Sequence, residues 1–464
     1  MKKLVLITIS LMITTSSIAQ CWDSFALGWD FTLAKKTDGS LWAWGSNIYG
    51  KLGVAIPGAA IQDRHKRVTT DQDWGMFSAG RDHSLALKND GTLWAWGRND
   101  RGQIGDGTDG INFSKDSPVQ IGTGSDWQVV GTGNEHSLAI KANGTLWAWG
   151  YNGEGRLGDN TSTDRLVPTQ IGTGTNWRSV VAGYDHSVGL TNDGKIYTWG
   201  SNGFGQLVLG GTTTIYTRYV PTRVGTASNW KFIDAGDSHT IALKNDNTLW
   251  VGGNNYDGQL GLGTNGFVQT LVQMGTDTWL QVAAGSKFTI GIKSDGTLWS
   301  WGNNFRGQLG NGTTNVNTNV PGQIGTDNDW QMVAAGLDMA MAMKSNGVVY
   351  TWGNNSNGQL GTPGPNQSYN VPTAIECYAL AVNDFSVSNI LKVYPNPASD
   401  YVFVQTDSNY LILKTVVSDI TGQSVLSCDG DCQKLNIDHL SEGIYFLKVI
   451  TNKGVFQDKF IKAN

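Results

Sequence analysis

Four of the six histidines in the sequence recur at one position of an internal repeat. They are His83, His136, His186 and His239. Histidines at a shared position suggest a metal ring or a proton relay, because imidazole binds metals and titrates near neutral pH. The same position in the other copies holds Phe31, Phe288 and Met339, which do neither. We therefore predict that the histidines pack inside the protein with one ring nitrogen hydrogen-bonded, and that they bind no metal.

An acidic residue precedes that position in five copies of the repeat. These residues are Asp30, Asp82, Glu135, Asp185 and Asp338. Pairs of carboxylates hydrolyse glycosidic bonds, and a ring of them binds cations. A short acidic side chain in a turn also accepts backbone N–H bonds, and the regular spacing favours that structural role. A secreted hydrolase that acts on polysaccharide through these carboxylates is kept as the alternative function.

Other catalytic signatures are missing from the sequence. It has no Gly-x-Ser-x-Gly motif and no cysteine–histidine nucleophile pair, while His65 and His439 stand alone. Seven Asn-x-x-Gly loops lack the Lys-Ser/Thr of a phosphate-binding loop: Asn47, Asn99, Asn152, Asn202, Asn255, Asn304 and Asn355. Cys428 and Cys432 form a lone C-x₃-C, which favours a hairpin disulfide or two thiols over a metal site. We expect no catalytic residues and no cofactor.

The repeat that carries these residues occurs seven times. Its clearest mark is Leu41-Trp42-Ala43-Trp44-Gly45, which returns at Leu93–Gly97 and Leu146–Gly150 and more loosely in four later copies. An anchor tryptophan opens each copy: Trp22, Trp74, Trp127, Trp177, Trp230, Trp279 and Trp330. The anchor lies 23 residues before the glycine of the Trp-Gly pair in every copy, although the full period varies from 49 to 53.

Each copy contains four predicted strands. In the third copy they are Trp127–Val130, His136–Ile140, Thr145–Trp149 and a segment around Val167–Ile171, with an Asn-Gly turn between the second and third. Four antiparallel strands in about 50 residues make one propeller blade. The predicted fold is therefore all-β, a seven-bladed β-propeller over residues 20–377, followed by a small β-sandwich.

The repeats resemble the regulator-of-chromosome-condensation propeller family. The resemblance rests on the pattern AG-x-x-HS-x-AL…DG…WG-x-N-x-x-G-Q-L-G, which is clearest at Ala79–Leu87 and Trp96–Gly105. Two departures stand out: Gly252 replaces the second tryptophan in copy five, and copy four is expanded at Leu207–Gly210. The resemblance implies a binding platform.

The two ends of the chain indicate export. Residues 1–19 have Lys2 and Lys3, an apolar run and Ala19 at the cut, as in a signal peptide. The apolar run is shorter than a membrane span, and no other stretch is long enough to be one.

The net charge is −5 and no Lys/Arg run occurs, so we expect no nucleic-acid partner.

The C-terminal residues form a second predicted domain. After a linker at 378–388, residues 389–464 carry alternating strand patterns at Tyr401–Val404, Thr415–Gln423 and Leu440–Val449. The elements YPNPASD, D-x-TG-Q and L-x-x-GIYFLKV resemble the C-terminal sorting domain of type IX secretion cargo; an ordinary adhesion-type sandwich is the alternative. The resemblance implies a Bacteroidetes-type host, contact with the type IX machinery, and a secreted or outer-membrane surface location.

Cys21 and Cys377 flank the repeat region. Cys21 precedes the first anchor tryptophan, and Cys377 follows the last fourth-strand segment, so the two lie where the circle of blades is cut. We predict a disulfide between them, which would replace the missing peptide link. Acylation of Cys21, as in a lipoprotein, is the competing interpretation.

We predict the binding surface from the loops. In a four-stranded meander the first and third loops of every blade emerge on one face. Aromatic and arginine side chains at these variable loops have no repeat-wide packing role, and such residues typify binding hot spots. The predicted ligand-binding face contains Trp29, Asp30, Tyr49, Arg81, Arg101, Tyr151, Tyr184, Phe204, Tyr256, Phe305 and Arg306. A protein or glycan ligand fits this mixture; the alternative is that the rings fold back over the blade edges.

Overall fold

The computed structural model describes residues 21–55, 61–211, 216–362, 367–375, 391–406, 410–419, 423–452 and 454–463. It divides the chain into two compact units, Met1–Cys377 and Tyr378–Asn464. The predicted signal peptide, the predicted linker and Cys377 lie outside the described residues. No helix in the described part of the chain is long and apolar enough to cross a membrane.

The described residues of the first unit form seven four-stranded antiparallel blades, each with its strands in chain order. The first strands are β1 (Trp22–Leu27), β5 (Trp74–Ala79), β9 (Trp127–Thr132), β13 (Trp177–Ala182), β17 (Trp230–Ala235), the end of β20 (Phe267–Ala284) and β24 (Trp330–Ala335). The second strands are β2 (Phe31–Lys36), β6 (His83–Lys88), β10 (His136–Lys141), β14 (His186–Thr191), β18 (His239–Lys244), β21 (Phe288–Lys293) and β25 (Met339–Lys344).

The third and fourth strands complete the blades. The third strands are β3 (Leu41–Ser46), β7 (Leu93–Gly97), β11 (Leu146–Gly150), β15 (Ile196–Ser201), β19 (Thr248–Asn254), β22 (Leu298–Gly302) and β26 (Val349–Gly353). The fourth strands are β4 (Ile61–Arg67), β8 (Lys115–Gln120), β12 (Arg165–Gln170), β16 (Thr217–Arg223), the start of β20, β23 (Thr318–Gln323) and β27 (Tyr369–Ile375). The predicted propeller is confirmed, and β20 serves blades 5 and 6 in turn.

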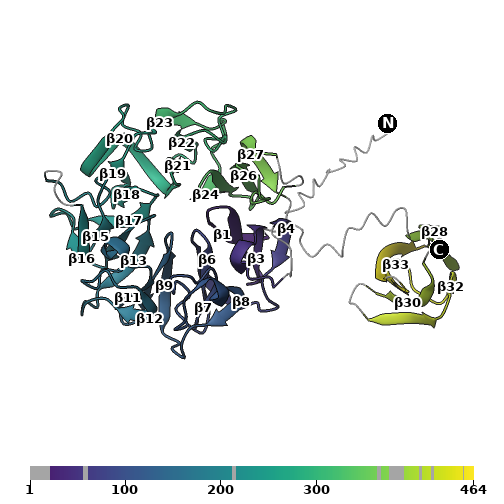
Figure 1. Cartoon of the computed structure of the whole chain (residues 1–464). Coiled ribbons are helices and arrows are strands. Elements are labelled where there is room, and N and C mark those ends of the chain that lie inside the picture. The colour runs from purple at the N-terminus through teal and green to yellow at the C-terminus, as the bar shows by residue number, and fades with distance from the viewer. Residues whose placement is uncertain are drawn as a thin grey trace, which may run out of the picture. The chain divides into compact units, whose positions relative to one another are not determined.

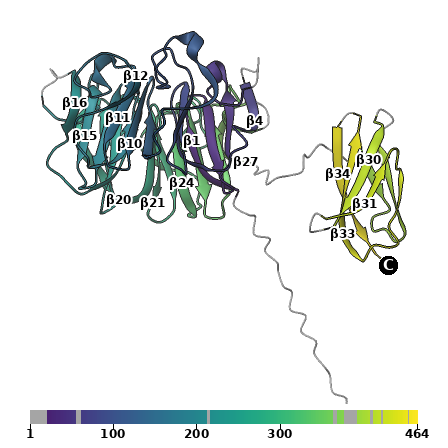
Figure 2. The same ribbon diagram turned by 90° about the horizontal axis from the view of Figure 1, so that it is seen from below.

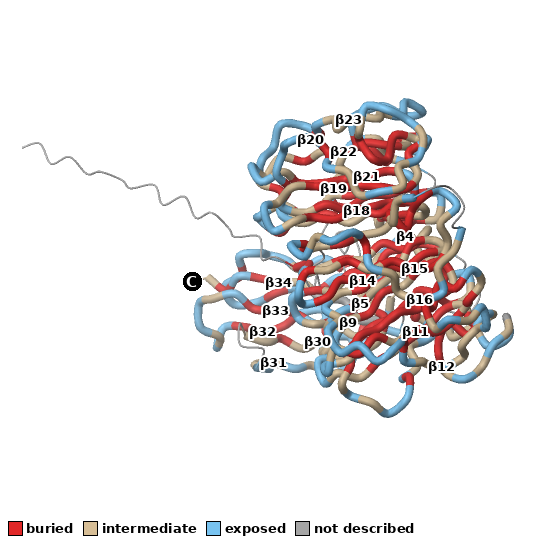
Figure 3. Tube along the Cα trace, turned by 90° about the vertical axis from the view of Figure 1, so that its left-hand side faces the viewer, coloured by how far each residue is buried: buried red, intermediate tan, exposed pale blue. Residues whose placement is uncertain are grey.

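The blades are arranged radially around a common centre, with first strands such as β1, β9, β13 and β17 nearest the centre and β4, β8, β12 and β16 at the rim (Figure 1). Figure 2 shows the strands of the blades from the side. Buried residues concentrate in strands such as β14, β15, β18 and β19, and most exposed residues lie in the loops and at the outer strands (Figure 3). Stacking the sheets buries faces that a single blade leaves in water, which accounts for the many buried tryptophans.

One buried backbone carbonyl joins each blade to the next. In blade 2 the carbonyl oxygen of Gln103 accepts a hydrogen bond from the Ser137 hydroxyl (2.8 Å) and another from the Trp149 indole (2.9 Å), both in blade 3. We call this group, repeated in every blade, the junction carbonyl. It belongs to Lys51, Gln103, Arg156, Gln206, Gln259, Gln308 and Gln359.

The same contact closes the ring. Gln359 of blade 7 accepts from the Thr32 hydroxyl (2.8 Å) and the Trp44 indole (3.0 Å) of blade 1. Cys21 packs in the same core cluster as Ile375, at the end of β27. Cys21 is disulfide-bonded, and Cys428 pairs with Cys432. Cys377 lies outside the described residues, so its pairing with Cys21 stays a prediction.

The two sequence departures compensate each other at the junction of blades 4 and 5. In blade 3 the indole of Trp149 packs against Gly105 of blade 2. At the equivalent positions blade 4 has Val208, which is buried, and blade 5 has Gly252. A Cβ atom at position 252 would lie 2.4 Å from Val208 Cγ1. At this junction the side chain comes from blade 4 and the glycine from blade 5, which is the reverse of the arrangement between blades 2 and 3. The space between the two blades stays filled.

The second unit is a β-sandwich. One sheet has the order β28 (Leu391–Tyr394), β29 (Tyr401–Thr406), β32 (Lys434–Asn436). The other has the order β31 (Ser424–Asp429), β30 (Ile412–Ser418), β33 (Gly443–Thr451), β34 (Gly454–Lys462). Val402 and Val404 of one sheet share a buried core with Leu447 and Val449 of the other, so the predicted sandwich is confirmed.

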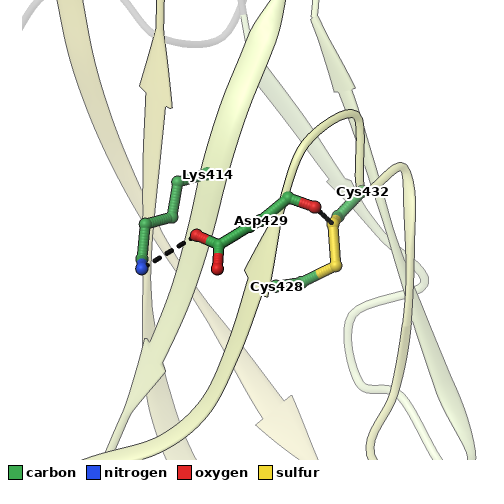
Figure 4. Close-up of a disulfide and its surroundings, with 4 residues drawn as sticks. All are labelled: Lys414, Cys428, Asp429 and Cys432. Carbon is green, nitrogen blue, oxygen red and sulfur yellow. Dashed lines mark hydrogen bonds and ion pairs between the residues drawn. A yellow bond between two sulfur atoms is a disulfide. The ribbon is translucent and has the colours of Figure 1, made fainter.

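The strand bounds of this unit differ from the sequence prediction in two places. The prediction of one strand over Thr415–Gln423 is wrong, because β30 ends at Ser418 and β31 begins at Ser424. The strand predicted from Leu440 begins only at Gly443, because the N–H of Leu440 donates to Ile437 O in a turn. Cys428, near the end of β31, forms a disulfide with Cys432 in the segment that follows, and Asp429 at the end of β31 pairs with Lys414 at 2.9 Å (Figure 4).

We predict that Gly252→Ala lowers the free energy of unfolding by about 1–3 kcal/mol, because the new methyl group overpacks the junction against Val208. Adding Val208→Ala is expected to recover part of the loss. Gly203→Ala is the matched control, since a Cβ there meets nothing within 4 Å. Chemical denaturation measures all three variants. Equal stability of Gly252→Ala and Gly203→Ala would contradict the packing described here.

Candidate functional site

The first and third loops meet on one face of the propeller, as predicted. Lys51 lies in the third loop of blade 1, and its Nζ atom is 2.6 Å from Asp30 and 2.7 Å from Asp82 in the first loops of blades 1 and 2. In blade 6, Gln308 of the third loop donates to Asp338 in the first loop of blade 7 at 3.2 Å. We call this surface the loop face.

The acidic residues of the first loops are engaged in these contacts. Lys51 is only 2% exposed and bridges two of them. Arg98 lies 3.5 Å from Asp82 and 3.4 Å from Glu135. Arg156, 4% exposed, pairs with Asp185 at 2.6 Å. Burial raises the pKa of Asp185, and the neighbouring Arg156 guanidinium opposes that effect. The carboxylates thus hold neighbouring loops together.

Three of the predicted binding residues contact each other at the mouth of the central channel. The Arg81 guanidinium lies 3.8 Å from the centre of the Trp29 ring and donates to the Tyr184 hydroxyl at 3.4 Å. It also donates to Asn134 Oδ1 at 3.2 Å. The Trp29 and Tyr184 ring centres are 6.2 Å apart, although they come from blades 1 and 4. These half-buried side chains therefore fold over the channel mouth.

The channel behind this cluster has a volume of about 490 Å³ and is lined by the first strands of all seven blades. Asp234 stands on its wall, where Ser78, Gly131 and Ala283 occupy equivalent positions. Burial raises the pKa of Asp234 to about 6, although its carboxylate accepts backbone N–H bonds from Ala284 and Ala235. At the mouth, burial also raises the pKa of Asp237, which bonds to the Ser286 hydroxyl.

Two more predicted rings lie against arginines. The guanidinium of Arg98 is 5.3 Å from the centre of the Tyr49 ring. Tyr151 lies between Arg101 at 4.9 Å and Arg156 at 4.4 Å. Both tyrosines are half-buried. Like Trp29 and Tyr184, they have partners within the protein.

The remaining aromatic residues of the prediction are exposed. Phe204 is 42% exposed, Tyr256 58% and Phe305 60%. They come from the third loops of blades 4, 5 and 6, and the rings of Phe204 and Tyr256 touch edge to face at 6.4 Å. Arg306, also exposed, lies 5.1 Å from the Phe305 ring. We call Phe204, Tyr256 and Phe305 the aromatic ridge.

Sequence reasoning missed the cations that organise the loop face. Lys51 and Arg156 occupy the position at which five blades have the glutamine of the G-Q-L-G motif. This departure from the repeat could have identified both residues. Arg98 occupies the variable position after the Trp-Gly pair, which gave no signal. Each of the three has an acidic partner in the next blade, and these pairs become visible only once the blades are stacked.

The repeated histidines lie in the interior, as predicted. The Nε2 atoms of His83 and His136 are 2.9 Å from the hydroxyls of Ser137 and Ser187 in the next blade. Because each hydroxyl donates its proton to a junction carbonyl, it accepts from the imidazole, and Nε2 carries the proton. Burial lowers the pKa of His83 to about 4. No group of three or more histidine, cysteine or acidic residues in the described ranges is arranged to hold a metal ion.

Comparison with protein families agrees with this geometry. Two models described as the regulator of chromosome condensation (RCC1) repeat match the propeller. One matches 38–87, 143–190, 193–243, 295–343 and 346–381; the other matches 22–51, 77–103, 128–156, 177–206, 230–259 and 279–308. The chain belongs to the RCC1 repeat family. A secretion system C-terminal sorting domain matches 392–463, and the chain is thus an RCC1 propeller exported by type IX secretion.

Curated relatives share part of this propeller. The Ultraviolet-B receptor UVR8 of Arabidopsis thaliana is 32% identical over 32% of this chain and 34% of its own length. The probable E3 ubiquitin-protein ligase HERC6 of Homo sapiens is 34% identical over 52% of this chain and 19% of its own length. The matches thus span about a third or less of these relatives.

Solved structures show the same fold. Human WBSCR16 is 23% identical, with a TM-score of 0.66 over 73% of this chain and 95% of that one. Yeast RCC1 (Prp20), in a structure with Kap60, is 21% identical, with a TM-score of 0.66 over 85% and 93%.

We predict that acidification destabilises the protein through its buried histidines. Between the folded pKa of His83, about 4, and the ordinary value of 6.5, the unfolded chain binds a proton that the folded chain does not. Stability due to this residue is therefore present above pH 6.5 and declines as the pH falls toward 4. His83→Phe introduces the residue that blade 1 has at this position, Phe31. From pH 7 to pH 5 we expect the free energy of unfolding of this variant to fall by about 2 kcal/mol less than that of the wild type.

Denaturant titrations of both proteins at the two pH values measure this difference. Asp234, whose pKa is raised, has the opposite dependence, but it is present in both proteins and cancels. Identical pH dependence of the two proteins would show that His83 is not held neutral by burial.

Proposed function

We propose that this protein is a secreted or cell-surface binding protein that captures a protein ligand through the aromatic ridge of its loop face. This proposal rests on the exposure of Phe204, Tyr256 and Phe305 on adjacent blades. The exposure of each aromatic ring to water is energetically unfavourable. Exposed apolar clusters bordered by polar residues mark interaction sites.

The contacts within the loop face divide it into two parts. Trp29, Arg81 and Tyr184 bond to each other over the channel, so they rigidify the centre of the face. Tyr256 and Phe305 are 58% and 60% exposed and are therefore accessible to a ligand. This division supports the outer part of the loop face, over blades 4 to 6, as the contact surface.

The character of the surface favours a protein over a glycan. Lys287 and Arg306 are exposed near the ridge, and aromatic residues with arginine are enriched at protein interfaces. Among proteins of the same fold, yeast RCC1 has been solved bound to Kap60, and Prp20p of Saccharomyces cerevisiae is described by its binding to Gsp1p and histones. A glycan remains the second ligand class to test. The hydrolase alternative has no comparable support, because Lys51, Arg98 and Arg156 pair with its carboxylates.

We predict that replacing Phe204, Tyr256 and Phe305 with serine weakens ligand capture at least about tenfold and leaves the melting temperature nearly unchanged, because these rings are exposed. The purified chain is immobilised and exposed to labelled surface proteins and to a glycan array. Ligands retained by the wild type are then measured with each variant.

The control is a triple variant on the third loops of blades 1 to 3, with Ile48, Asp109 and Glu154 replaced by serine. These residues are also exposed, and we expect the control to bind as the wild type does. Undiminished capture by the ridge variant, or equal loss in both variants, would place the binding surface elsewhere.

A further inference from the structure

Six of the seven blades end their second strand with a lysine: Lys36, Lys88, Lys141, Lys244, Lys293 and Lys344. In each blade the ammonium group lies over two aromatic rings. It is 4.6–5.7 Å from the centre of the anchor tryptophan. It is 3.6–5.6 Å from the centre of a third-strand tryptophan or tyrosine. Every such blade thus fills an aromatic cation site with its own lysine.

Blade 4 keeps the aromatic pair and lacks the lysine. Thr191 ends its second strand, while Trp177 and Tyr197 remain in place. Their ring centres are 5.2 Å apart with an interplanar angle of 69°. In blade 7 the equivalent rings of Trp330 and Tyr350 are 5.1 Å apart at 71° and carry the ammonium of Lys344. The two aromatic pairs therefore have the same geometry.

A pocket of about 530 Å³ opens where the lysine is missing. Thr191, Trp177 and Tyr197 all line it. Trp177 is half-buried, whereas the other six anchor tryptophans are 0–7% exposed. Among the described residues no cation–ring contact involves Trp177 or Tyr197, and the nearby Lys195 pairs with Asp193 at 2.6 Å.

The rest of the lining suits an alkyl chain that carries a positive charge. Ile171, Val220 and Pro221 supply apolar surface from the outer strands of blades 3 and 4. Asp193 lies beside Thr191, whose hydroxyl donates to it at 2.6 Å, and its carboxylate, which pairs with Lys195, is 44% exposed at the pocket. Aliphatic stem, ammonium and aromatic faces meet in the same way in the six blades that hold their own lysine.

We propose that this pocket of blade 4 binds an external primary alkylammonium group, such as the side chain of a lysine in a partner polypeptide. The pocket lining contains no residue of the aromatic ridge, so the proposal does not depend on the ligand of the loop face. The occupant replaces the ammonium that Thr191 does not supply.

The test uses the purified full-length chain and saturation-transfer NMR with n-butylammonium as the probe. We expect binding with a Kd of about millimolar order, as suits a single cation over two rings. The neutral analogue 1-pentanol is expected to bind at least about tenfold more weakly. An acetylated Gly-Lys-Gly amide distinguishes the sources: tighter binding than butylammonium indicates a polypeptide lysine, and weaker binding indicates a free amine.

Two substitutions at position 191 decide the assignment. Thr191→Lys restores the residue of the other blades and is expected to abolish butylammonium binding without lowering the melting temperature. Thr191→Val removes the same hydroxyl without adding a charge and is expected to keep binding. Equal binding by wild type and Thr191→Lys, or no difference between butylammonium and pentanol, would overturn the proposal.

The reciprocal change provides an independent test in blade 7. Lys344→Thr empties the site between Trp330 and Tyr350 and leaves Asp327 and Asp329, its present partners, without a cation. We expect the number of bound butylammonium ions to rise from one to two. A folded Lys344→Thr variant that binds no additional ion would contradict the equivalence of the two pockets.

Discussion

The junction carbonyl is the contact on which the propeller depends. A backbone oxygen within each third loop lies out of reach of water and must be satisfied by the next blade. At four junctions the carbonyl, which belongs to Lys51, Gln103, Gln259 or Gln359, accepts both from the Ser or Thr after the histidine position and from the second tryptophan of the third strand. The carbonyls of Arg156 and Gln206 accept from the hydroxyl alone, and that of Gln308 accepts from the indole alone. This one contact explains why three separate motifs of the repeat, His-Ser, Trp-Gly and Gly-Gln-Leu-Gly, recur together. The glycine of the Trp-Gly pair has φ between 95° and 108° in every blade, which an L-residue rarely adopts.

The loop face inherits its order from the same contact. The residue that presents the junction carbonyl also sends its side chain to the loop face, and in blades 1 and 3 that side chain is Lys51 or Arg156. Each cation then holds the acidic first loop of its neighbour. The backbone thus joins the blades inside while the side chains join them at the surface. The aromatic ridge stands on third loops held by the glutamines of blades 4 to 6.

The structural features that repeat along the chain could be predicted from the sequence, whereas the contacts that form only when the blades stack could not. The strands, the buried histidines and the shared face of the first and third loops all follow from local pattern and topology. The contact of Arg81 with Trp29 and Tyr184 joins three blades, and no single repeat unit contains it. Val208 and Gly252 were visible as departures, but only their packing shows that one compensates the other. Thr191 also departs visibly from a lysine, although its consequence, an open pocket beside Trp177, requires the structure.

The role of the junction carbonyl is tested most directly by comparing two hydroxyl deletions. Ser137 shares the Gln103 carbonyl with the Trp149 indole, whereas Thr240 is the hydroxyl at Gln206, where Gly252 offers no indole. Each hydroxyl also faces one histidine, so that loss is common to both. Denaturant unfolding of Ser137→Ala and Thr240→Val measures the difference. We expect Thr240→Val to lower the free energy of unfolding by about 1–3 kcal/mol and Ser137→Ala to lower it clearly less, because only Thr240→Val leaves a buried carbonyl unpaired. Equal losses in the two variants would contradict it.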